Sequence, residues 1–152
     1  MGSALYDNFL FNALGGAAAG NAPNINWADD VIKCTLHTTA YAPSKTLHDY
    51  VDDLTVEVAA GGAYATGGVT LTTKTIALTS SVLKLDADDA VWAASTITAE
   101  VAVVSDRTPA TAATQPLISY HDNAAAVSSS GGEFRVQWAV AGIVSITISA
   151  EA

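Results

Sequence analysis

Cysteine, positive charge and long apolar runs are all scarce in this sequence. Cys34 is the only cysteine among 152 residues, so the chain cannot form a disulfide within itself. Six lysine and arginine residues stand against 15 aspartate and glutamate residues, and the net charge at pH 7 is −9. The basic residues form no cluster that could neutralise phosphate groups, so we expect no binding to nucleic acid.

The apolar stretches are short and interrupted. None approaches the roughly 18 to 20 residues that a membrane-spanning helix needs, and no basic segment precedes the first apolar residues, so we expect no membrane partner and no secretory signal. Charged residues make up only 14% of the chain, although 50% of it is hydrophobic. Small and hydroxylated residues must therefore cover much of the surface, which suits a protein in contact with neighbours.

Motifs of catalysis are also missing. His37, His48 and His121 lack metal-ligand spacing, and nothing in the sequence places them near the aspartates at 86, 88 and 89. No serine lies in a G-x-S-x-G turn. The glycine pairs at 61–62 and 67–68 precede a threonine-rich segment rather than a helix, unlike loops that bind phosphate. We therefore predict no catalytic residue, no cofactor and no enzymatic activity.

Three aspartates, Asp86, Asp88 and Asp89, lie together in "DADDAVW". The segment offers only the opening of an EF-hand loop, which also needs a glycine and a distal glutamate. A calcium site completed by a second loop is one alternative. The interpretation that we favour is a tight turn, in which Asp88 and Asp89 bind nearby backbone amides and Trp92 enters the core. The sequence therefore predicts no metal site.

Residues 3–14 favour a short amphipathic helix, and the following "GGAAAGNAPN" resembles a flexible linker. We predict that residues 1–24 form a helical arm and linker, and that residues 1–16 dock on a neighbouring subunit or shell. The predicted partner contacts are the large apolar side chains Leu5, Tyr6, Phe9, Leu10 and Phe11. The alternative is that the helix folds back on its own domain.

From Trp27 onward the apolar residues alternate with a period of two, which predicts one β-domain over residues 25–152. Strands are expected near residues 31–37, 55–59, 69–78, 82–86, 96–104, 117–121, 133–140 and 143–149. Residues 44–54 favour a short helix, and Ala141–Gly142 favours a turn that joins the last two strands as a C-terminal hairpin. The predicted fold is mainly β, an antiparallel β-sandwich or jelly-roll-like domain with a short N-terminal helical arm and one short helix.

Four side chains that could carry chemistry are expected in the core instead. Cys34 alternates with Ile32 and Leu36 on one strand face, which indicates a buried thiol and not a reactive one. The three tryptophans occupy inward-alternating positions, which favours packing over a sugar-binding face. They are Trp27, Trp92 and Trp138.

Several segments together resemble a family of small structural proteins of tailed phages and prophages. The resemblance is carried by "ALYDNFLFNALGG", "INWADDVIKCTLHTTAYAP", "LHDYVDDL", "VLKLDADDAVWAASTITAEVAVV", "PLISYHD" and "GGEFRVQWAVAGIVSITI". It spans nearly the whole chain, and its motifs are structural. It implies a virion protein present in many copies, a decoration or cement protein on the capsid exterior, made in the host cytoplasm and bound to the major capsid protein. The segment "AAAGNAP" is longer than expected for the family, which leaves the target of the arm open.

The low charge fraction and exposed strand edges further predict a homo-oligomer, a homotrimer on the particle. Two other function classes stay open, a tail or fibre component that contacts the host and a small hydrolase. A receptor-binding module would need exposed aromatic residues in loops, and Tyr41 and Tyr64 are the loop aromatics here. A hydrolase would need a pocket that contains titratable groups with shifted pKa values, and the sequence points to no such pocket.

Overall fold

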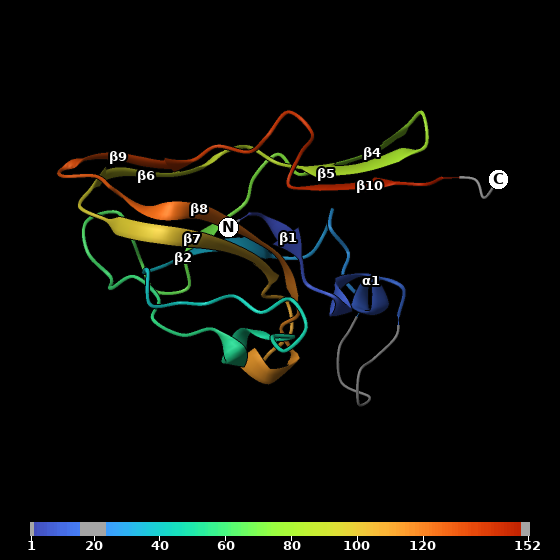
Figure 1. The fold of residues 1–152 in the computed structure, drawn as a ribbon, viewed down its shortest axis with the longest axis horizontal. Coiled ribbons are helices and arrows are strands. Elements are labelled where there is room, and N and C mark those ends of the chain that lie inside the picture. Colours follow the sequence, from blue (N-terminus) through green and yellow to red (C-terminus); the bar gives the residue numbers. More distant parts are fainter. Residues whose placement is uncertain (1, 16–23, 150–152) are drawn as a thin grey trace.

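The structure is a computed structural model that describes residues 2–15 and 24–149. Its two β layers enclose the main core (Figure 1). The lower layer is a five-stranded antiparallel sheet in the order β1-β8-β7-β2-β3. Its strands are β1 (Ala4–Leu5), β8 (Leu117–Ser128), β7 (Thr98–Asp106), β2 (Ile32–His37) and β3 (Val69–Thr70). The predicted mainly β fold is confirmed, and the layered arrangement is consistent with a β-sandwich.

The upper layer consists of a three-stranded sheet, β10-β5-β4, and a two-stranded sheet, β6-β9. Its strands are β4 (Thr75–Thr79), β5 (Val82–Asp86), β6 (Ala90–Ser95), β9 (Gly132–Val136) and β10 (Val144–Thr147). Because β6 follows β5 and β10 follows β9 along the chain, the two sheets form one bent antiparallel ribbon (Figure 1). The aspartate segment lies at the bend.

The predicted C-terminal hairpin is wrong. β9 pairs with β6, and β10 pairs with β5, so the last two strands lie in different sheets. A turn closed by the Gly142 N–H and the Ala139 carbonyl, 2.8 Å apart, carries the chain from one sheet to the other. Alternation of apolar residues shows which face of a strand is buried, but not which strand lies beside it, and this is why the sequence pattern suggested the wrong neighbour.

Other element boundaries also differ from the prediction. The helix predicted over residues 44–54 is limited to a 3₁₀ turn, η2 (Val51–Asp53), because the Asp53 carboxylate accepts hydrogen bonds from the amides of Asp49 and Tyr50. Residues 55–59 form only an isolated bridge, between His37 and Glu57. β6 was not predicted as a strand. The other helical elements are α1 (Asn8–Ala13) and η3 (Ala112–Thr114).

Two hydrophobic clusters lie on opposite faces of the five-stranded sheet. The main core fills the space between the layers and contains Cys34 together with Trp27, Trp92 and Trp138, so the prediction that these side chains are buried is confirmed. The smaller cluster includes Tyr6, Tyr41, Val101, Val103 and Leu117. None of the helices formed by residues 2–15 and 24–149 has the length and apolar composition of a membrane span.

Candidate functional site

The N-terminal segment packs on its own domain. β1 pairs with β8, and the Tyr6 N–H donates to the Ile118 carbonyl at 3.1 Å. Tyr6 is 1% exposed and Phe9 is 3% exposed, while Leu5 packs partly against the main core. Residues 2–15 thus adopt the arrangement that the sequence offered as the alternative to a docked arm. The predicted linker residues 16–23 lie outside the described residues.

Two of the five predicted partner contacts do face outward. Leu10 is 43% exposed and Phe11 is 51% exposed on α1, next to the still more exposed Leu14. Tyr6 and Phe9 have no surface left for a partner, because they already fill the chain's own two cores. The partner-contact prediction therefore remains a prediction for Leu10, Phe11 and the partly buried Leu5.

The tight turn predicted for the aspartate segment is wrong, because residues 87–89 connect β5 to β6 without forming a turn. The hydrogen-bond partners of Asp88 and Asp89 are instead distant in sequence. The Asp89 carboxylate accepts hydrogen bonds from the Trp138 backbone amide at 3.1 Å and from Arg135 at 3.2 Å. The Asp88 carbonyl accepts the Trp138 indole N–H at 2.9 Å. Asp86 forms an ion pair with Lys84 at 2.8 Å. The contacts of Asp88 and Asp89 connect the two strands of the bent ribbon where the regular ladder is interrupted, whereas the Asp86 ion pair lies within β5.

Each aspartate of the bend is therefore engaged within the chain. Among residues 2–15 and 24–149, no three histidine, cysteine, aspartate or glutamate side chains come together as the ligands of one metal ion would. The arrangement that the structure shows is a structural junction, in which carboxylates replace missing ladder hydrogen bonds.

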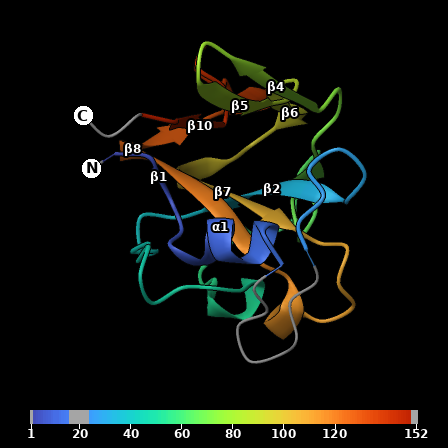
Figure 2. The ribbon, with the colours of Figure 1, turned by 90° about the vertical axis from the view of Figure 1, so that its right-hand side faces the viewer.

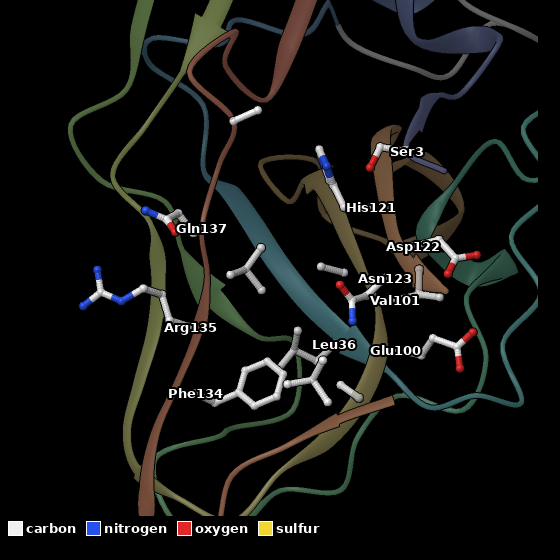
Figure 3. Close-up of a pocket in the computed structure, with 15 residues that line it drawn as sticks. Ser3, Leu36, Glu100, Val101, His121, Asp122, Asn123, Phe134, Arg135 and Gln137 are labelled. Atoms are coloured by element: carbon white, nitrogen blue, oxygen red, sulfur yellow. The ribbon is translucent and has the colours of Figure 1, made fainter. Parts of the chain in front are cut away.

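A cavity of about 320 Å³ opens between the layers beside β7, β8 and β9. Its floor contains Leu36 and Phe134, and Figure 3 shows His121 near Ser3 at one end of the space. The charged lining residues do not converge on it. Arg135 extends away from the floor on one side, where it binds Glu133 and Asp89, and Glu100 lies on the opposite side (Figure 3).

A serine and a histidine meet beside this cavity. The Ser119 hydroxyl lies 3.2 Å from His121 Nε2, and burial lowers the pKa of His121 to about 4, so the imidazole is neutral at pH 7. Ser119 is only 1% exposed, however, so a substrate carbonyl cannot reach its hydroxyl. The His121 ring packs against Trp138 with centroids 5.1 Å apart. The geometry suits a packed core histidine better than a nucleophile and its base.

The other two histidines and the loop tyrosines are also committed to internal contacts. His37 is 1% exposed, and its two ring nitrogens contact the Thr55 carbonyl at 2.8 Å and the Thr35 hydroxyl at 3.0 Å. His48 Nδ1 lies 3.0 Å from the Tyr41 hydroxyl. Tyr41 and Tyr64, which the sequence placed in loops, do lie outside the strands, but they are 4% and 2% exposed and present no aromatic surface.

Several exposed apolar side chains gather on the three-stranded sheet. Ile76 is 59% exposed and Leu78 is 64% exposed on β4, and Ile148 just beyond β10 is 59% exposed. Opposite residues of an antiparallel pair share one face, so the register places these β4 side chains beside four further apolar residues. We call this set the β4–β5–β10 face: Ile76, Leu78, Leu83, Leu85, Val144 and Ile146.

The inner part of the β4–β5–β10 face belongs to the core, whereas the outer part does not. Leu85 and Val144 are 4% and 2% exposed and join the main cluster. The sheet then extends beyond the lower layer, above α1, as both ribbon views show (Figures 1 and 2). The face also carries no charged side chain, although the chain has a net charge of −9. It is therefore the strongest candidate for a surface that contacts another protein.

No protein-family model matches the chain, and no curated protein or solved structure matches it either. The described residues form a mainly β, two-layered protein with an uncharged apolar sheet face.

Proposed function

We propose that the chain is a structural protein of a bacteriophage virion, a decoration or cement protein that binds the outer surface of the major capsid lattice. The observation that carries the proposal is the β4–β5–β10 face, whose Ile76 and Leu78 are more than half exposed. The segments quoted from the sequence supply the resemblance to virion proteins. A face of this kind suits a stable protein partner.

Energetics favour attachment through apolar contacts. Burying one large aliphatic side chain contributes roughly 1.5–3 kcal/mol, whereas an exposed ion pair contributes at most about 1 kcal/mol. The chain is sparsely charged, and the ion pairs among its described residues lie on exposed or partly exposed side chains, as Lys45 with Asp7 does. Ile76 and Leu78 could thus contribute more to binding than the charges around them. Leu10 and Phe11 on α1 offer a second apolar contact.

The polar residues support a binding role over catalysis. The Ser119 hydroxyl is inaccessible, and the rings of His37, His48 and His121 serve as hydrogen-bond or packing partners inside the chain. Charged groups at the cavity do not converge on a common point (Figure 3). An enzyme would need an accessible nucleophile or base in such a space.

The test is binding to particles of the encoding phage prepared without this protein. We expect saturable binding at hundreds of copies per particle for the unchanged chain, and at least a tenfold loss of affinity for Ile76→Lys. Thr75→Lys is the matched control, because Thr75 is exposed on the same strand but points to the opposite face. Affinity for particles can be measured by co-sedimentation.

Copy number separates the proposal from its alternative. A handful of copies per native particle, counted by quantitative mass spectrometry, would identify a tail or fibre component instead of a decoration protein. Equal losses for Ile76→Lys and Thr75→Lys would show that charge, and not the β4–β5–β10 face, controls attachment.

A further inference from the structure

β4 is an edge strand without the features that usually keep such edges from pairing. Its order in the sheet, β10-β5-β4, leaves one side of the strand without a neighbour among the described residues. All five residues of Thr75–Thr79 are exposed. The strand contains no charged residue, no proline and no bulge, and each of these is a common protection against association at an edge.

The turn that follows β4 defines which backbone groups point outward. Thr79 is opposite Val82, so Ser80 and Ser81 form a two-residue hairpin turn, and their φ angles of 50° and 64° are those of a type I′ turn. The residues that flank such a turn form a hydrogen-bonded pair, and the pairs alternate along the ladder. Thr75, Ala77 and Thr79 therefore bond to β5. The N–H and C=O groups of Ile76 and Leu78 point to the free side.

We propose that β4 pairs with β4 of a second copy of this chain, antiparallel and about a two-fold axis at Ala77. Ile76 then lies opposite Leu78 of the second copy, and the outward groups of these two residues match as a hydrogen-bonded pair. We call this β4–β4 contact the seam. The two-fold axis makes its two halves equivalent, so about four backbone hydrogen bonds form across it. The result is one continuous sheet of six strands from two copies.

The sequence of β4 supports a second copy as the occupant. An isologous contact requires a surface that complements itself. "TIALT" meets that requirement when centred on Ala77, because threonine then faces threonine and isoleucine faces leucine, which are favourable cross-strand pairs. A partner of unrelated sequence would not need this symmetry.

The charge distribution also favours a second copy of this chain as the partner of β4. Two copies of a chain with net charge −9 repel each other over most of their surfaces. β4 brings no acidic side chain to the seam. The nearest charges on β5, Lys84 and Asp86, neutralise each other in an ion pair of 2.8 Å. Copies can therefore approach along β4 without placing unpaired carboxylates against each other.

The seam is short, and this determines how it should behave. Stable interfaces bury roughly 1,200–2,000 Å² in total, more than one edge strand of this length supplies. Association in solution should therefore depend on concentration, and it should strengthen where copies are held close together. A two-fold seam does not close a trimer, so the homotrimer predicted from the sequence would require a separate contact. The pairing does not depend on the proposed virion role.

The register can be tested with single cysteines. Residues opposite each other at a non-hydrogen-bonded position have Cβ atoms about 4.5–5.5 Å apart, so Ala77→Cys places two thiols at the axis within reach of a disulfide. Thr75→Cys is the matched control, since it is on the same strand face and exposed as well. Its two copies would lie about 13 Å apart along the strands. Native Cys34 is fully buried and does not compete.

Under mild oxidation we expect the Ala77→Cys chain to form covalent dimers at least tenfold faster than the Thr75→Cys chain, as seen on non-reducing gels. Equal rates for the two variants would overturn the proposed register, even if the chain proves to be dimeric.

A second experiment removes a donor rather than adding a thiol. Leu78→Pro deletes an outward N–H without removing a hydrogen bond to β5, a position at which an edge strand accepts proline. Leu78→Thr shortens the same side chain but keeps the N–H. In sedimentation over a concentration series we expect the unchanged chain and Leu78→Thr to dimerise and Leu78→Pro to stay monomeric. A monomeric unchanged chain at all concentrations, or equal dissociation of both variants, would overturn edge pairing.

Discussion

Single residues control the backbone where strands approach each other closely. Gly68 has a φ of +70°, and a Cβ atom at this position would lie 1.9 Å from the Cys34 carbonyl oxygen. The Cys34 backbone cannot shift away from position 68, because Cys34 belongs to β2, which pairs with β3 on one side and with β7 on the other. Gly68 thus allows the chain to enter β3 directly against β2.

We expect Gly68→Ala to lower the free energy of unfolding by about 3 kcal/mol or more, because it combines a left-handed backbone with a backbone clash. Gly67→Ala is the matched control. Gly67 has a φ of +88°, but a Cβ atom there would meet nothing within 4 Å. The control should therefore lose only about 1–2 kcal/mol. Urea denaturation of both variants measures the difference, and equal losses would contradict the clash.

At the scale of elements, the β4–β5 hairpin is built with an unfavourable turn sequence. Ser80 and Ser81 both adopt positive φ angles, 50° and 64°. Asparagine and glycine are strongly preferred in such turns, since glycine has no Cβ and asparagine tolerates the left-handed region. The hairpin forms despite this turn because β5 also pairs with β10, which holds the hairpin in the three-stranded sheet.

We expect the double variant Ser80→Asn, Ser81→Gly to raise the free energy of unfolding by about 1 kcal/mol through the relief of this strain. Ser145→Gly on β10 serves as the control, because glycine within a strand should cost roughly 0.5–1 kcal/mol. Thermal or urea denaturation checks both signs. A loss of stability in the double variant would mean that the serines make contacts that outweigh their backbone strain.

At the scale of the whole molecule, two buried titratable groups should give opposite pH dependences of stability. Burial raises the pKa of Asp106 to about 6, with Asp30 nearby adding to the effect. One oxygen of the Asp106 carboxyl has no hydrogen-bond partner among the described residues, and the side chain is 0% exposed. Burial lowers the pKa of His121 to about 4. Each group disfavours its charged form in the folded state.

The signs follow from proton binding. Between about pH 4 and 6 the folded Asp106 holds a proton that the unfolded chain has released, so its contribution to stability falls as the pH rises. Between about pH 6.5 and 4 the unfolded chain protonates His121 while the folded chain does not, so this contribution falls as the pH falls. In the unchanged protein the two slopes partly cancel.

We expect Asp106→Asn to remove the pH dependence that Asp106 contributes and to leave that of His121. The free energy of unfolding of the variant should then fall by up to about 2 kcal/mol as the pH falls from 6.5 to 4. His121→Gln should show the reverse trend, with stability rising by a similar amount as the pH falls from 6 to 4. Urea denaturation at several pH values checks both variants. Parallel pH profiles in the two variants would show that other groups dominate.

The sequence by itself determined the mainly β class and much of the core. Alternation around Cys34 and Trp92 identified buried side chains, because strand side chains alternate strictly between two faces. Trp27 and Trp138 are buried as predicted, although they lie outside the strands. The aspartates were correctly placed at the connection between two strands, but the tight turn predicted there is absent. Local patterns succeed here because they depend only on neighbours along the chain.

Only the tertiary structure decided which surfaces are already used. The N-terminal pattern is amphipathic whichever apolar surface it meets, and packing on β8 buried Tyr6 and Phe9 while Leu10 and Phe11 stayed exposed. Pairing of β9 with β6 and of β10 with β5 replaced the expected hairpin. Ile76 and Leu78 alternate like core residues, yet they remain exposed, because the three-stranded sheet extends past the layer that would cover them (Figure 1). Burial of a strand face depends on which elements pack over it, and the sequence pattern of the strand alone does not specify those elements.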